Sequence, residues 1–418
     1  MISVSTIESF VDAVAANWEK QAVCLLSGGP ALSEGIVFSA VQRAAQEYRE
    51  YLADYTKKQW ENAQGNWVTD IARLDTDPPI KMRFYTDYSA RDADLVDFLP
   101  TADDLSFDGY HRRITKACNG VPYGLIITEG LEKHSREIVD FFRCIVDPVL
   151  ARVGLHSSEL GIFFGNSPAT GFGVHQDLHG TIAHTVSGTK SLRYWTPDAN
   201  IEIGNIAYRS AYESARSESE VMVARESGFM YWPQTYFHTG EAPDLELTCT
   251  VNSSLTPMTP LGVLHSAAAQ FRTMLEGSTG NDKAPLKVMK TADGMIEFGE
   301  TTQLLGKLEQ FIGTAGRTLL ERTAVEAFSA GGYFKAPLTP ENSHVSVERR
   351  LRISTRICWH CDVQGIFVAC DGHGVLLPPE AEAWFRRLMR SGVCDSWSRL
   401  PPETKGWCKD MQRIGALL

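Results

Sequence analysis

The chain of 418 residues lacks any apolar run long enough to cross a bilayer, and its N-terminus lacks the basic and apolar regions of a secretory signal. It also lacks an excess of basic charge, because 40 Lys and Arg stand against 51 Asp and Glu. A general nucleic-acid binder needs a basic surface. We therefore expect a cytoplasmic protein that is not inserted in a membrane and does not bind nucleic acid.

Several common catalytic patterns are missing as well. The sequence contains no glycine-rich loop that would cradle a phosphate, no nucleophile elbow and no Ser-His-Asp order. Its nine cysteines are scattered and odd in number, which together with the missing secretory signal predicts mostly reduced thiols. The pattern that does stand out is built from histidine, aspartate and lysine.

The stretch from Gly171 to Lys190 contains the pattern His175-x-Asp177. Alternate residues of a strand point to the same face, so both side chains can reach one ion. His238, which ends an aromatic run, is the predicted third ligand. Two imidazoles and one carboxylate suit a non-haem Fe(II) site that leaves three metal positions open. His-x-Asp alone is weak evidence, because a satisfied buried histidine is its usual explanation.

From about Leu160 to Leu255 the chain resembles the JmjC/cupin-like branch of Fe(II)/2-oxoglutarate oxygenases. In that family, His-x-Asp is followed by Gly-x-Lys at the start of a strand, and Gly188-Thr189-Lys190 is similar. The distal histidine of the family ends a segment that contains Gly, Pro and aromatic residues, and the stretch from Gly228 to His238 is similar. A strand that ends in Val251-Asn252 follows, as it does in the family.

The resemblance implies roles for individual residues. The implied iron ligands and catalytic residues are His175, Asp177 and His238. Lys190 would pair with the distal carboxylate of 2-oxoglutarate, and Asn252 matches a position that contacts the cosubstrate or the metal shell. Phe172 is apolar where some relatives place a polar cosubstrate contact, and Thr181 is a candidate substitute for that contact.

The implied activity is that of a 2-oxoglutarate-dependent dioxygenase that uses Fe(II) and O2 and hydroxylates an unactivated C–H bond, with succinate and CO2 as co-products. We favour a side chain of a protein or peptide as the substrate, because the layout is multi-domain. The nearest alternative is a hydroxylase of a small molecule such as an amino acid, and the third is a non-enzymatic cupin-like binding protein. The substrate, the oxidised carbon and the choice between hydroxylation and demethylation stay open.

The implied fold is α+β, with a double-stranded β-helix (the jelly-roll of cupin and JmjC proteins) as its core. We expect a helical and strand extension over 1–120, the catalytic barrel over 121–259, a helical segment over 260–338 and a winged-helix-like domain over 339–418. This layout is similar to that of ribosomal-protein hydroxylases, a JmjC subgroup in which the helical segment mediates dimerisation. We therefore expect a homodimer formed through 260–338.

Local patterns place the individual elements. Apolar residues at helical spacing predict helices over 7–14, 36–63 and 135–153, and a Pro at the start favours a helix over 379–390. Short apolar or aromatic runs predict strands over 81–86, 124–128 and 161–165, and paired strands over 351–359 and 365–369.

The C-terminal part holds a competing metal pattern, in which Cys-x-x-Cys precedes Cys-x-x-His. Its residues are Cys358, Cys361, Cys370 and His373. Four thiolate or imidazole ligands suit a structural zinc site. Both pairs lie in stretches that we predict to be strand or strand end, however, and a strand places Cys358 and Cys361 on opposite faces. The predicted strands argue against a zinc site but leave the question open, and the metal content per chain would decide it.

Overall fold

The protein divides into two compact units in this computed structural model. The first comprises Met1–Pro257 and Gly331–Thr339, and the second comprises Met258–Ala330 and Pro340–Leu418. The structure describes residues 1–63, 78, 80–154, 156–199, 213, 215–258, 288–290, 296–298, 316–333, 351–354, 356–362, 364–394 and 399–417. Among these residues, no helix has the length and apolar character needed to span a membrane.

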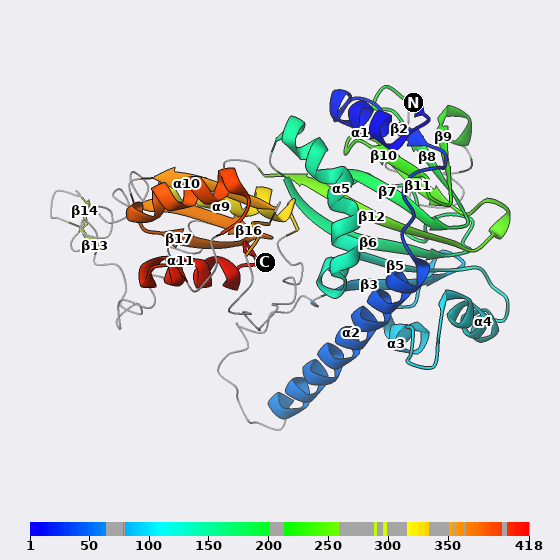
Figure 1. The fold of residues 1–418 in the computed structure, drawn as a ribbon. Helices are drawn as coiled ribbons and strands as arrows, with labels where there is room; N and C mark the ends of the chain where they lie inside the picture. Colours follow the sequence, from blue (N-terminus) through cyan, green and yellow to red (C-terminus); the bar gives the residue numbers. More distant parts are fainter. Residues whose placement is uncertain are drawn as a thin grey trace. The chain divides into compact units, whose positions relative to one another are not determined.

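The first unit is built on a nine-stranded sheet (Figure 1). Its strands are β1 (Ile2–Val4), β2 (Val23–Leu25), β3 (Lys81–Thr86), β4 (Ser89–Ala90), β5 (Tyr123–Glu129), β6 (His156–Gly165), β7 (Gly180–Ser187), β10 (Phe229–Trp232) and β12 (Thr248–Pro257). They lie in the order β1-β2-β10-β7-β12-β6-β5-β3-β4, and only β1 and β2 are parallel. The predicted strands over 81–86, 124–128 and 161–165 are confirmed as β3, β5 and part of β6.

A second, antiparallel sheet contains β8 (Thr189–Trp195), β9 (Glu220–Arg225) and β11 (Phe237–Glu241) in the order β11-β8-β9. An isolated bridge between His175 and His238 adds one more residue pair to its β11 edge. The consecutive strands β6 and β7 lie in the large sheet and β8 and β9 in the second sheet, and the chain then alternates between the two sheets from β9 to β12. The predicted mixed α+β class is confirmed, and this arrangement of two sheets agrees with the expected double-stranded β-helix core.

Helices cover one face of the large sheet. They are α1 (Ile7–Ala16), α2 (Glu34–Ala63), α3 (Leu95–Phe98), α4 (Phe107–Ala117) and α5 (Arg136–Val153), and the predictions over 7–14, 36–63 and 135–153 are confirmed. The side chains of Thr6 and Ser135 cap the N-termini of α1 and α5. The apolar stripe of α5 is buried in the main core, where it packs with the sheet.

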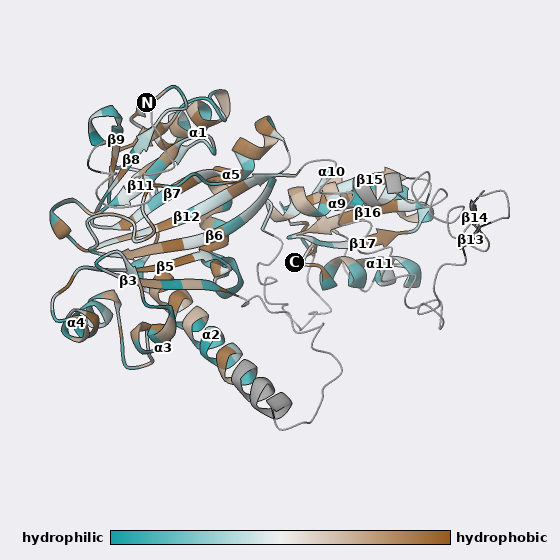
Figure 2. Ribbon diagram, turned by 180° about the vertical axis from the view of Figure 1, so that it is seen from behind, coloured by the Kyte–Doolittle hydropathy of each residue, from teal (hydrophilic) through white to brown (hydrophobic). Residues whose placement is uncertain are grey.

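The strands sort their side chains between the two faces of the sheet. On β6, Leu160, Ile162 and Phe164 belong to the core that contains the helices. The intervening residues Gly161 and Phe163 line a cavity on the opposite face. Figure 2 shows hydrophobic residues along β5 and β6, whereas β12 mixes hydrophobic and hydrophilic residues. Helix packing on one face thus leaves the other face free to form a site with the second sheet.

A short segment from Gly331 to Tyr333 returns to the first unit and packs against β6 and β12. The Ser158 amide donates a hydrogen bond to the Gly332 carbonyl, and the Ser158 hydroxyl donates one to the Gly331 carbonyl, both at 2.9 Å. The fully buried Tyr333 hydroxyl lies 2.6 Å from the Ser253 hydroxyl. Tyr333 belongs to the main core, so the returning segment is tied to the face of the large sheet that the helices cover.

We expect Tyr333→Phe to lower the free energy of unfolding by about 1 to 2 kcal/mol, because the buried Ser253 hydroxyl would lose its partner. Urea unfolding followed by circular dichroism measures the change. Tyr48→Phe on α2 is the control, because within the described residues the Tyr48 hydroxyl makes no hydrogen bond. Equal stabilities of the two variants would contradict the expectation.

The second unit contains α9 (Gly316–Ala330), the antiparallel strands β15 (Ile357–Asp362), β16 (Gly365–Cys370) and β17 (His373–Leu377), and then α10 (Glu382–Ser391) and α11 (Pro402–Arg413). The short strands β13 (Val288–Lys290) and β14 (Ile296–Phe298) form a separate pair. The paired strands are confirmed, although the first begins at Ile357 and not at Leu351, and α10 matches the helix predicted over 379–390. This arrangement does not confirm a winged helix.

The predicted helical segment over 260–338 lies largely outside the described residues. Helix α9 falls within it, and the rest of the segment is described only at 288–290, 296–298 and 331–333. Dimerisation through this segment and the boundaries of the four predicted domains stay predictions.

Candidate metal centre and cavity

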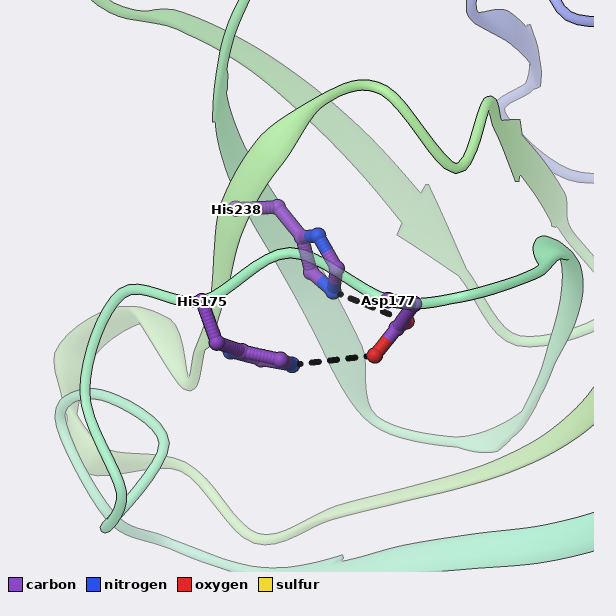
Figure 3. A group of neighbouring side chains, drawn as sticks. All are labelled: His175, Asp177 and His238. Atoms are coloured by element: carbon purple, nitrogen blue, oxygen red, sulfur yellow. Dashed lines mark ion pairs between the residues drawn. The ribbon is translucent and has the colours of Figure 1, made fainter. Parts of the chain in front are cut away.

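Two imidazoles and one carboxylate converge in the first unit (Figure 3). The Asp177 carboxylate lies 3.6 Å from Nε2 of His175 and 3.4 Å from Nε2 of His238. One ligand atom from each residue lies within 4.8 Å of the other two. Of the predicted strand around His175, the structure retains a single bridge, in which His175 and His238 exchange backbone hydrogen bonds of 3.0 and 2.8 Å. That bridge places the two rings side by side.

The backbone fixes which ring nitrogen faces the centre. Nδ1 of His175 lies 3.1 Å from the Gly173 carbonyl, and Nδ1 of His238 lies 3.1 Å from the Tyr236 carbonyl. A carbonyl can only accept a hydrogen bond, so each Nδ1 carries a proton when the ring is neutral. The Nε2 lone pair of each ring then points towards the Asp177 carboxylate. Backbone carbonyls orient the histidine ligands of many metal sites in the same way.

Electrostatics favours a cation at this point. Burial is the main reason that the pKa of His175 is lowered to about 3, so its ring is neutral near pH 7. Burial raises the pKa of Asp177, but the neighbouring His238 and His175 rings outweigh it and hold that pKa below its usual range. The neutral His175 ring, the anionic Asp177 carboxylate and Nε2 of His238 therefore face one another. The donor set fits a divalent metal ion, and its composition is that of non-haem Fe(II) sites.

The competing zinc pattern does not form a cluster. Among the described residues, the group of His175, Asp177 and His238 is the one set of three or more His, Cys, Asp or Glu side chains that could hold a metal ion. Cys358 and Cys361 both lie in β15, as the strand argument requires. Cys370 and His373 face each other across the turn between β16 and β17.

A cavity of about 820 Å³ opens beside the three residues. Four of its lining residues have polar side-chain atoms that are shielded from solvent and lack a hydrogen-bond partner within the described structure. They are Thr181 Oγ1, Trp232 Nε1, Thr250 Oγ1 and Asn252 Oδ1. Most buried polar atoms in proteins are paired. Four unpaired atoms around one cavity indicate that a polar ligand completes them.

Lys190 brings a cation to the same cavity from the start of β8. Burial lowers the pKa of Lys190 to about 8, against the opposing effect of Glu241. Within the described part of the chain, no carboxylate forms an ion pair with the Lys190 ammonium. Arg193, another cationic residue on β8, pairs with Glu241 at 2.9 Å and does not line the cavity. A partly buried ammonium without an anion suits an anionic ligand.

The structure brings every predicted site residue to one cavity. His175, Asp177, His238, Lys190, Asn252 and Thr181 all line it. His179 also lines it, whereas His184 is fully buried against the rings of Phe141 and Phe229. Trp232, Thr250 and Gly240 were not predicted. The alternation of β12 would have found Thr250, which shares a face with Asn252.

Comparison with known proteins gives a weak structural likeness only. No protein-family model and no curated protein matches the sequence. The structure of YcfD, a ribosomal oxygenase from Escherichia coli, in complex with cobalt and 2-oxoglutarate is similar with a TM-score of 0.45 and 11% identity, over 84% of this chain and 90% of that chain. Another crystal structure of YcfD gives a TM-score of 0.43 and 13% identity over the same shares. A likeness this weak does not assign an activity.

Proposed function

We propose that the protein is an Fe(II)- and 2-oxoglutarate-dependent dioxygenase that hydroxylates an unactivated C–H bond. One observation carries the proposal: His175, Asp177 and His238 line the same cavity as the ammonium of Lys190. Two imidazoles and one carboxylate leave three positions on the metal for a chelating acid and O2. The lysine supplies the charge that the far carboxylate of such an acid requires.

Different residues of the cavity bind the metal and the cosubstrate. Bound Fe(II) would supply the oxidative chemistry that converts 2-oxoglutarate, O2 and a substrate C–H bond into succinate, CO2 and the hydroxylated substrate. His175, Asp177 and His238 would hold the metal. Lys190 holds the distal carboxylate, and the unpaired Thr181 hydroxyl can donate a hydrogen bond to another oxygen of the acid. The unpaired Oδ1 of Asn252 only accepts hydrogen bonds, so it suits a donor such as a water molecule beside the metal.

A cluster of aromatic rings packs against one side of the centre. The Phe172 ring packs edge-on against His175, with ring centroids 4.4 Å apart and an interplanar angle of 75°. Phe172 also contacts Tyr85 and Phe163. The apolar residue that replaces a polar contact of the family thus packs beside a metal ligand. Exclusion of water strengthens the electrostatic interactions inside the site.

The substrate enters from the rim of the cavity. Lys81, Arg83, Thr128 and Thr256 line the cavity and are exposed to solvent. A cavity of about 820 Å³ has room for a second molecule beside a small dicarboxylate. We propose a side chain of a protein or peptide as the substrate, and a small molecule such as an amino acid is the alternative that the same opening admits. A cytoplasmic location and a homodimer formed through 260–338 complete the proposal.

Turnover tests this function directly. The protein is loaded with Fe(II) without oxygen and then given O2 and 2-oxoglutarate, with pools of peptides or of small molecules. We expect succinate to form, and to form faster with the pool that contains the substrate. A protein that binds neither Fe(II) nor 2-oxoglutarate would contradict the proposal and would favour a non-enzymatic binding protein.

The affinity for 2-oxoglutarate should fall above about pH 8, since burial lowers the pKa of Lys190 to about 8 and only the ammonium form pairs with a carboxylate. Below that pH the charge is fully present. Above it, the Kd should rise by up to about tenfold for each pH unit. Titration calorimetry across this range measures the effect. Lys190→Arg should flatten the curve, because a guanidinium stays charged, and a flat curve for the unaltered protein would contradict the assignment.

A further inference from the structure

Gly240 lies on β11, two residues after His238, and lines the same cavity. A Cβ placed on Gly240 would lie 2.9 Å from Cε of Lys190 and 3.0 Å from its Nζ. Real Cβ atoms almost never approach another atom so closely. The φ of Gly240 is not in the left-handed region, so the backbone does not explain the glycine. The glycine is explained instead by the space that its missing side chain leaves for Lys190.

The strand around Gly240 cannot easily retreat from Lys190. The Gly240 amide donates a hydrogen bond to Thr170 Oγ1 at 2.9 Å, and its carbonyl accepts one from the Thr170 amide at 2.8 Å. Gly240 also pairs with Leu192 of β8, the strand that carries Lys190. Any added side chain would therefore displace the flexible end of Lys190 before it moved the backbone.

We propose that Gly240 is a positioning residue for the Lys190 ammonium. Its missing side chain lets the ammonium lie over β11, with the Phe163 ring centroid 6.0 Å away, and face the cavity. This inference rests on the proposed function, because it takes Lys190 as the partner of the distal carboxylate of 2-oxoglutarate. His238 and Gly240 share one face of β11, so the metal ligand and the support of the carboxylate partner lie on adjacent positions of that face.

Binding without turnover isolates this effect. We compare Gly240→Ala, Lys190→Ala and the double variant, each loaded with Mn(II) in the absence of O2, and measure the Kd of 2-oxoglutarate by calorimetry. Gly240→Ala should raise the Kd about fivefold, which corresponds to about 1 kcal/mol. The double variant should bind no more weakly than Lys190→Ala, because no ammonium is left to displace. In turnover, KM for 2-oxoglutarate should rise in Gly240→Ala while kcat at saturation is retained.

Gly124→Ala on β5 is the matched control. A Cβ placed on Gly124 meets nothing closer than Cβ of Ser167 at 3.9 Å, which is an ordinary contact. Its Kd for 2-oxoglutarate should equal that of the unaltered protein. An unchanged Kd in Gly240→Ala would overturn the proposal. So would additive losses in the double variant, because Gly240 would then act on the ligand independently of Lys190.

A measurement without ligand separates this inference from the proposed function. The rate at which an acylating reagent labels Lys190 as a function of pH gives the pKa of its amine. Gly240→Ala should shift that pKa and Gly124→Ala should not, whether or not 2-oxoglutarate binds; an unshifted pKa would overturn the inference.

If Gly240→Ala fails to fold, the double variant should recover folding, because the clashing side chain is gone. Misfolding of both variants would place the clash elsewhere and would overturn the proposal.

Discussion

Replacing either His175 or Asp177 by alanine should abolish iron binding and 2-oxoglutarate turnover while the protein stays folded. The loss should exceed about a hundredfold, because removal of groups that merely orient metal ligands already costs about 10- to 100-fold. The fold should survive because both residues lie outside the main core, and Thr170 also holds their segment on β11 through its hydrogen bonds to Gly240. Iron per chain, succinate formation and circular dichroism measure the three effects.

His179→Ala is the matched control for the metal. His179 lies two residues beyond Asp177, lines the same cavity, and has its Nε2 3.6 Å from the Asp177 carboxylate. It does not belong to the group of three converging ligand atoms. Its variant should bind iron at nearly the normal stoichiometry. Full iron content and full turnover in both His175→Ala and Asp177→Ala would refute the metal assignment.

Lys190→Ala should raise KM for 2-oxoglutarate at least about tenfold, equivalent to about 1.4 kcal/mol, the contribution of one charge-assisted pair. Iron content should not change, because Lys190 is not a ligand. Lys190→Arg should retain part of the activity, since a guanidinium keeps the charge but differs in shape. Initial rates at varied 2-oxoglutarate, measured beside iron stoichiometry, test all of these expectations.

Lys81→Ala separates this effect from a general loss of positive charge. Lys81 lines the same cavity, but it is exposed and pairs with Glu129 at 2.7 Å. Its variant should keep the normal KM for 2-oxoglutarate. An unchanged KM in Lys190→Ala would mean that another cation binds the acid, or that 2-oxoglutarate is not the cosubstrate.

The sequence contained enough information to find the ligands, because His-x-Asp spacing and the distal histidine are local patterns. It did not contain the way in which they are held. The strand expected around His175 is reduced to one bridge. Pairing with His238 on β11 positions His175, where a longer strand was expected to do so. The nine-stranded sheet was equally out of reach, since the pairing of Val23 with Tyr231 joins distant segments that no local periodicity links.

The cavity shows a second limit of sequence reasoning. Trp232 is an ordinary strand residue in the sequence, and only the packed structure shows that its indole N–H has no partner among the described residues. The role of Gly240 is likewise visible only in the structure, because the side chain with which an added Cβ would clash is that of Lys190, which comes from another strand. Motif reasoning also offered a zinc site that did not assemble, and strand alternation gave the correct objection to it.

The return of Gly331–Tyr333 to the first unit makes that unit discontinuous in sequence. A truncated version that stops at Pro257 would remove Tyr333 and leave the buried Ser253 hydroxyl without its partner. The first unit should therefore be isolated by joining Pro257 to Gly331 through a short flexible linker. Because Met258–Ala330 belongs to the second unit together with Pro340–Leu418, each unit is assembled from two separate stretches of the chain, and neither can be excised as one continuous segment.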